Sequence, residues 1–303
     1  MANVSTKSRT NTTHIVSEVI NGVDHEFEVT FEPSEYNEIS VKISSNGKSA
    51  VVGYISRDDY AQSPREVCDN LDHMISFHNR YTLGDKHSFK DSEEFLKSLC
   101  EEAVGYEKWE KLLERAEKKV EVAYKAGETQ SQKGRESFWS TQDQIMQELY
   151  DSILEKNYVM LSVGIYDHSG ITMYTGVTRG WDNSNVGWIY MSKAEILENW
   201  SGKVLTPALK AKAIEFMQAS VEEYDKYLTG DVWGVCYETF NNIAEEGEEP
   251  EWEEDEQDAC WGFFGDTYAE EELASGMPHW EEQIEATVPE KEAADQPILF
   301  QEV

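Results

Sequence analysis

Hydrophobic and polar residues alternate in four short segments near the amino-terminal end of the chain. These segments are HIVSEVI, HEFEVTFE, EISVKIS and SAVVGYI, and turn-forming Asn, Gly and Ser residues lie between them. A period of two between turn residues is typical of antiparallel strands. We therefore expect residues 1–90 to form a β-rich part that also contains one helix.

That helix is predicted to begin at Ser63. Ser63, Pro64 and Glu66 match the pattern of an N-cap, a proline in the first turn and a capping box. Apolar residues then recur at helical spacing over 67–78, and the glycine at Gly84 is typical of a stop. The charged residues that follow the stop should lie in a loop.

The middle of the chain has the pattern of two amphipathic helices. Residues 91–126 begin with Asp91 and Glu94 as cap partners and carry an apolar stripe, and a second helix is expected over 138–156. A polar stretch separates the two. We expect residues 91–156 to be a helical hairpin, either an arm or an insertion.

The remaining residues, 157–303, mix strand and helix patterns. YVMLSVGIYD, GITMYTGV, VGWIYM and DVWGVCYE read as strands, and LTPALKAKAIEFMQASVEEYDKYL reads as a long helix. We expect this part to be an acidic α+β domain with a flexible tail. The fold class predicted for the whole chain is α+β, with antiparallel sheets, a long helical hairpin and an acidic C-terminal region.

Charge narrows the range of partners. Sixty Asp and Glu oppose 26 Lys and Arg, which gives a formal net charge of −34. Such a chain repels nucleic acid, anionic membranes and free nucleotides unless a local basic pocket intervenes, so a protein with a basic surface is the expected partner. No apolar run is long enough to span a membrane, and no secretion signal is evident.

The cysteines point to a reducing compartment. Cys68, Cys100, Cys236 and Cys260 form no CxxC pair, which disfavours a zinc knuckle or a disulfide framework and favours the cytoplasm. Cys260 and its neighbour Trp261 are expected to form a buried pair. The Cys260 thiol is not expected to be reactive, because no nearby cation would stabilise its thiolate form.

The acidic residues concentrate near the carboxyl-terminal end. Ten of the fourteen residues from Glu245 to Asp258 are acidic. Such a run is often a solvated or disordered loop. It approaches the charge density of duplex DNA only if its carboxylates share one face. On that condition, the residues expected to contact a basic partner are Trp252, as an aromatic anchor, and Glu253, Glu254, Asp255, Glu256 and Asp258.

A second candidate site combines histidine, arginine and aspartate from several segments. Its residues are His78, Arg80, Asp85 and His87, with Asp167, His168 and Asp182 from later segments. Such a set could assist metal-dependent hydrolysis, but no ligand spacing such as HExxH supports a metal, and no cofactor is expected. The alternative, which we favour, is that Arg80 and the carboxylates form buried ion pairs and loop caps that fix the strands.

Several segments in combination are similar to a family of uncharacterised proteins of bacteriophages and bacterial mobile elements. These are SPREVCDNLDHMISFHNRYTLGDKH, YDHSGITM, WDNSNVGWIYM, EEYDKYLTGDVWGV and ACWGFFGD, between about residues 63 and 266. The family usually has W-D-S-G-x-V-G where this chain has WDNSNVG. The resemblance implies a phage-like origin and no known activity.

Charge and resemblance together predict a non-enzymatic, phage-derived binding protein of the host cytoplasm. We expect it to inhibit a host defence or nucleic-acid-handling protein through protein–protein interaction, without direct contact to nucleic acid or membrane. Mimicry of the charge of DNA is one route to such inhibition. The sequence leaves open whether the chain forms a homo-oligomer. The alternatives are the metal-assisted hydrolase and a sponge that holds a signalling nucleotide with Arg80, Lys86 and Arg179.

Overall fold

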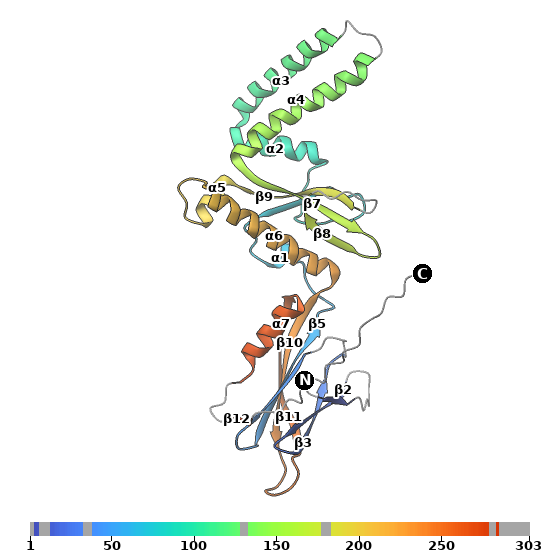
Figure 1. Ribbon diagram of the computed structural model, residues 1–303, viewed down its shortest axis with the longest axis vertical. Coiled ribbons are helices and arrows are strands. Elements are labelled where there is room, and N and C mark those ends of the chain that lie inside the picture. Colours follow the sequence, from blue (N-terminus) through green and yellow to red (C-terminus); the bar gives the residue numbers. More distant parts are fainter. Residues whose placement is uncertain are drawn as a thin grey trace, which may run out of the picture. The chain divides into compact units, whose positions relative to one another are not determined.

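The computed structural model describes residues 3–5, 13–32, 38–127, 133–176, 183–278 and 283–284 (Figure 1). The protein is α+β with antiparallel sheets, as its hydrophobic pattern predicts. It divides into two compact units. Unit 1 consists of residues 1–61 and 230–303, and unit 2 consists of residues 62–229.

Unit 1 is built from two antiparallel sheets and helix α7. The strand order is β1-β2-β3 in the smaller sheet and β11-β10-β5-β4-β12 in the larger one. The elements are β1 (Asn3–Ser5), β2 (Thr13–Ile20), β3 (Val23–Thr30), β4 (Ile39–Ser44), β5 (Ser49–Arg57), β10 (Val232–Asn242), β11 (Trp252–Phe264), α7 (Asp266–Gly276) and β12 (Gln283–Ile284). The four predicted N-terminal strands correspond to β2 to β5.

The central strands β5 and β10 of the larger sheet of unit 1 are covered on both faces. On one face, alternate residues of β2 and β3 pack against β5 and β10, and Phe27 meets Phe240 edge to face at 5.2 Å between ring centroids. On the other face, α7 covers Trp233 with Leu273. Each fully buried aromatic ring of this kind contributes about 2–3 kcal/mol. Alternate residues of the same strand therefore point to opposite faces of the sheet and belong to different hydrophobic cores.

Unit 2 is inserted in the chain between β5 and β10, which are neighbouring strands of the larger sheet. β5 and β10 pair antiparallel, with Arg57 opposite Trp233, although more than 170 residues separate these two positions. The predicted division at residues 90 and 156 is therefore not the one observed. The reason is that this long-range strand pairing joins the two ends of the chain into one unit, which no local pattern reveals.

Unit 2 has a four-stranded sheet of order β6-β9-β7-β8 between two sets of helices. One face packs against α6 and the other against α2, α3 and α4 (Figure 1). The elements are α1 (Pro64–Val67), β6 (His73–Ser76), α2 (Ser92–Val104), α3 (Tyr106–Gly127), α4 (Lys133–Asn157), β7 (Tyr158–Asp167), β8 (Ile171–Thr175), β9 (Asn183–Ser192), α5 (Lys193–Asn199) and α6 (Pro207–Thr229).

The predicted helix from Ser63 is much shorter than expected. Its N-cap is confirmed, since the Ser63 hydroxyl accepts from the Arg65 backbone N–H, but the helix ends at Val67. Met74 and Ile75 lie instead in β6, which pairs with β9, and they point into opposite cores. Apolar residues on both faces of a strand imitate helical spacing over such a short stretch.

The predicted helical hairpin is confirmed, with one break. Asp91 caps α2 through the Glu94 N–H, as expected. Gly105 then adopts a φ of 81°, a conformation that favours glycine, and it divides the first predicted helix into α2 and α3. α3 and α4 pack side by side. Among the described residues, no helix is both long and apolar enough to cross a membrane.

Candidate functional site

The predicted acidic residues lie together in a β-hairpin of unit 1. β10 and β11 pair along their whole length, and the loop between them carries the first acidic residues of the run. We call residues 245–258 the acidic hairpin. All ten of its carboxylate side chains are exposed. The expectation of a disordered loop is therefore wrong for residues 252–258, which belong to a strand.

Two polar side chains hold this hairpin in shape. The Asn242 side-chain oxygen accepts from the backbone N–H groups of Ala244 and Glu251, at 3.0 and 3.3 Å. Thr239 exchanges two hydrogen bonds with the backbone of Glu256, beside a bulge in the pairing. The carboxylates thus project from an ordered backbone.

The run forms a strand because β10 imposes one. Asp and Glu are poor strand formers, so local preference alone would not place five of them at positions 253–258. β11 is the edge of its sheet, and charged side chains at an edge prevent pairing with other chains. Edge protection is therefore a structural role that this sequence fulfils whether or not a partner binds.

Of the two tryptophans of β11, the one predicted as an anchor is partly buried. Trp252 packs against Phe27, and its indole N–H donates to His25 Nδ1 at 3.3 Å. Trp261, which was expected to be buried with Cys260, is instead 50% exposed, and Cys260 is exposed too. The reason is that Gly234, opposite Trp261, leaves room for its ring to lie flat on the outer part of the sheet. Trp261 is thus the better aromatic contact.

The second predicted set is only partly brought together, in unit 2. His78, Asp85 and His87 line one cavity of about 520 Å³ beside β6. Phe77 and Phe89 also line it, and both rings lie close to His87.

The hydrogen bonds around this cavity occupy the groups that catalysis would need. Both oxygens of Asp85 accept from the Arg65 guanidinium, at 2.8 and 3.0 Å. His87 Nε2 lies 2.9 Å from the backbone oxygen of Ser76, and His78 Nδ1 accepts from two backbone N–H groups of its own loop. These side chains therefore fix the loop, which is the structural role favoured from the sequence.

Of the later members of the set, Asp167 and His168 are described, and they do not complete a metal site with the earlier ones. Asp167 forms an ion pair with Arg80, but the Arg80 side chain is 67% exposed, so the pair is not buried as expected. His168 stacks on Tyr166. Asp182 lies outside the described residues. Among the residues that are described, no group of three or more His, Cys, Asp or Glu side chains is placed to hold a metal ion. Lys86, from the nucleotide-sponge hypothesis, pairs with Glu66.

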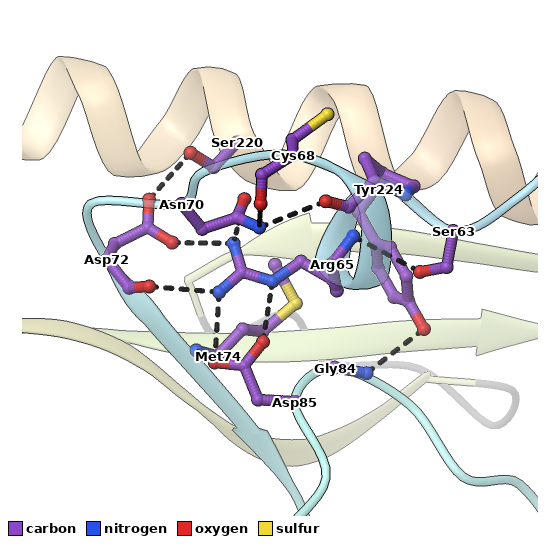
Figure 2. Close-up of polar contacts among 11 residues, drawn as sticks. Ser63, Arg65, Cys68, Asn70, Asp72, Met74, Gly84, Asp85, Ser220 and Tyr224 are labelled. Atoms are coloured by element: carbon purple, nitrogen blue, oxygen red, sulfur yellow. Dashed lines mark hydrogen bonds and ion pairs between the residues drawn. The ribbon is translucent and has the colours of Figure 1, made fainter. Parts of the chain in front are cut away.

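The sequence interpretation missed Arg65 as the centre of the charged network (Figure 2). Its side chain is 2% exposed and donates to Asp85, Asp72 and Asn70, while the other Asp72 oxygen accepts from Ser220 on α6. The signal was present, because Arg65 is the first cation of a segment rich in Asp. The predicted helix from Ser63 gave no indication of these contacts, because most of them are made to residues beyond its observed end at Val67.

The interpretation also missed Glu238, a buried carboxyl group of β10. In the segment VCYETF, the alternate residues 236, 238 and 240 lie on the same face of the strand, and Cys236 and Phe240 belong to the core. That alternation places Glu238 on the buried face. A carboxyl group at a core position of a strand was therefore a detectable anomaly.

Comparison of the chain with protein-family models, curated proteins and solved structures gave no match. The functional argument therefore depends on the geometry of the chain itself.

Proposed function

We propose that this protein binds a basic macromolecular surface through the acidic hairpin and thereby occupies a site that otherwise holds a nucleic-acid backbone. One observation carries the proposal. Positions 253–258 of β11 present five exposed carboxylates on one ordered strand at the free edge of a sheet.

The spacing of these charges supports the comparison with nucleic acid. An antiparallel strand rises about 3.4 Å per residue. The phosphates of one strand of a B-form duplex also follow at about 3.4 Å along the axis. Counted over both faces of β11, the carboxylates therefore approach the linear charge density of a single phosphate backbone. On either face alone they follow at about 6.8 Å, because successive side chains of a strand point to opposite faces, so the condition that they all share one face is not met.

The partner is proposed to be a host protein that handles nucleic acid or acts in defence. The resemblance of several segments to bacteriophage proteins motivates this choice, and the net charge of −34 favours a basic target. Binding of this kind requires no turnover, and the carboxylates would pair with Arg and Lys of the target. Electrostatic attraction would make association fast and sensitive to salt.

The test compares two variants with equal loss of charge. The hairpin variant carries Glu253→Gln, Glu254→Gln, Asp255→Asn and Glu256→Gln. The control carries Glu→Gln at four exposed positions of α3, which are Glu107, Glu110, Glu114 and Glu117. Each exposed charge contributes about 0.5 kcal/mol, so four contribute about 2 kcal/mol, or about 30-fold in affinity.

Proteins are captured from bacterial lysate on each immobilised variant and eluted with DNA at constant ionic strength. We expect wild type and the α3 control to retain the same proteins, the hairpin variant to lose them, and DNA to release them. Equal capture by the hairpin variant, or retention that DNA does not reverse, would contradict the proposal.

A further inference from the structure

A cleft in unit 1 lies on the same face of the larger sheet as Glu238. It has a volume of about 390 Å³, within the range of ligand pockets. Its walls come from β3, β5, β10 and β11 and include Thr30, Phe31, Tyr54, Cys236, Glu238 and Trp261. We call this the Glu238 cleft. It borders the acidic hairpin, because Gln257 and Asp258 also line it.

Glu238 is incompletely satisfied although it is only 2% exposed. Its Oε1 accepts from the Tyr54 hydroxyl at 2.8 Å and from the Thr30 backbone N–H at 3.3 Å. The Tyr54 hydroxyl also lies 2.9 Å from the Thr30 carbonyl oxygen, so its single proton is shared between two acceptors. Among the described residues, Glu238 Oε2 has no hydrogen-bond partner. A buried carboxyl oxygen without a partner is costly, which favours a ligand that can donate to it.

The acidic residues around the cleft favour a positively charged ligand. An adjacent cavity shares Ser56 and Trp261 with it and is also lined by Glu32, Asp58 and Asp59. Arg57 lines that cavity too, but its guanidinium lies over the ring of Trp233. The local field therefore attracts cations and repels anions.

The composition of the cleft favours an organic cation over a metal ion. Ca²⁺ and Mg²⁺ need about six oxygen ligands, and the described residues provide no cluster of three carboxylate, His or Cys side chains. The cleft instead offers aromatic walls, because Phe31 and Tyr54 lie 5.0 Å apart between centroids and Trp261 is half exposed. Aromatic rings beside a carboxylate are suited to guanidinium and ammonium groups.

We propose that the Glu238 cleft binds the cationic head of an alkylguanidinium or alkylammonium group, with Glu238 as counter-ion and Trp261 as aromatic wall. Such a group occurs in small amines and in Arg or Lys side chains. The inference goes beyond the proposed function, because it concerns the buried carboxyl group of Glu238 and a small cationic group, whereas the proposed function concerns exposed carboxylates and a macromolecular surface. The two sites share Asp258, but binding of butylguanidinium at Glu238 can be measured without any macromolecular partner.

Binding should release a proton at pH values where free Glu238 is still protonated, that is, below its raised pKa. Burial raises the pKa of Glu238. The hydrogen bonds from Tyr54 and Thr30 lower this pKa, and the nearby charge of Glu254 raises it further. Of the other groups facing Glu238, Cys236 has a pKa raised by burial to about 11, and burial also raises that of Tyr54. Gln257 and Asp258 of β11 line the same cleft, and His14 lies behind Phe31. A bound cation stabilises the ionised form of Glu238, so its proton is expelled.

The experiment is a calorimetric titration of the full chain with butylguanidinium and with its neutral analogue butylurea. We expect butylguanidinium to bind at least about tenfold more tightly than butylurea, with proton release detected by comparing two buffers. Glu238→Gln should lower the affinity for butylguanidinium at least about tenfold and abolish the proton release. Trp261→Ala should weaken binding several-fold.

Glu256→Gln is the matched control, because it removes one carboxylate of the same strand pair from the opposite face. It should change the affinity less than about twofold. A parallel titration with a short arginine peptide separates the two sources of the cation, since binding of both probes assigns the cleft to a protein side chain and binding of butylguanidinium alone assigns it to a small molecule. Absence of butylguanidinium binding, equal binding of butylurea, or unchanged affinity in Glu238→Gln would overturn the inference.

Discussion

Arg65 and Asp85 form a two-point ion pair, with Nε to Oδ1 at 2.8 Å and Nη2 to Oδ2 at 3.0 Å, and the Arg65 side chain is 2% exposed. The same guanidinium also holds Asp72, whose side chain is fully buried. This arrangement links α1, β6 and the loop after Gly84. It therefore explains why this stretch of an acidic chain needs a buried cation at position 65.

Arg65→Met should destabilise unit 2 by about 3–5 kcal/mol. The substitution leaves the buried carboxylate of Asp72 without its counter-charge, and breaking a buried pair from one side costs about that much. Urea unfolding of the full chain measures the effect. Arg80→Met is the matched control, because Arg80 is 67% exposed and an exposed pair contributes less than about 1 kcal/mol. Equal losses in both variants would contradict the assignment of Arg65 as the central cation.

The free energy of unfolding should depend on pH through Glu238. Burial raises its pKa in the folded state, while the unfolded chain ionises near the ordinary value of 4.5. Below that value both states are protonated and the contribution to stability is complete. As pH rises, the unfolded state ionises first, so stability is lost until the folded-state pKa is passed.

Glu238→Gln should remove this loss. The stability of the variant relative to wild type should therefore increase as pH rises above 4.5, until the folded-state pKa of Glu238 is passed, because the amide does not ionise. Denaturant unfolding at a series of pH values checks this, with Glu256→Gln as the control for loss of one charge. A difference between Glu238→Gln and wild type that is the same at every pH would contradict a raised pKa for Glu238.

Gly187→Ala should destabilise unit 2 by about 2 kcal/mol or more. A Cβ atom at Gly187 would lie 1.9 Å from the backbone oxygen of Ile75, so β6 and β9 would have to move apart. Gly170→Ala is a suitable control, because a Cβ there meets no atom within 4 Å. Thermal unfolding distinguishes the two. Similar melting temperatures for both variants would show that the strands tolerate the displacement.

Local features of the fold were predictable, and long-range ones were not. The caps at Ser63 and Asp91 and the strands over 158–175 follow from neighbouring residues alone. The end of α1 at Val67 depends on contacts of Arg65 with residues up to 20 positions away. Sequence periodicity contains no information on such contacts, so the predicted helix was too long.

The candidate site shows the same division. The acidic run was recognised from charge alone, yet its strand conformation comes from pairing with β10, against the preference of Asp and Glu. Glu238 and Trp261 were not recognised as neighbours, because the cleft that they line is formed by four separate strands. Only the alternation in VCYETF gave a local indication.

The pairing of β5 with β10 predicts that unit 1 folds without unit 2. The Asp58 backbone N–H donates to the Val232 carbonyl oxygen at 2.8 Å, so the two strand ends are already in contact. Replacing residues 59–230 with a short Asn-Gly turn should therefore close an ordinary hairpin, since this dipeptide favours tight connections between antiparallel strands. We expect the shortened protein to unfold cooperatively in urea and to retain butylguanidinium binding with the affinity of the full chain. A shortened chain that lacks a cooperative transition would show instead that unit 1 requires the inserted residues for its stability.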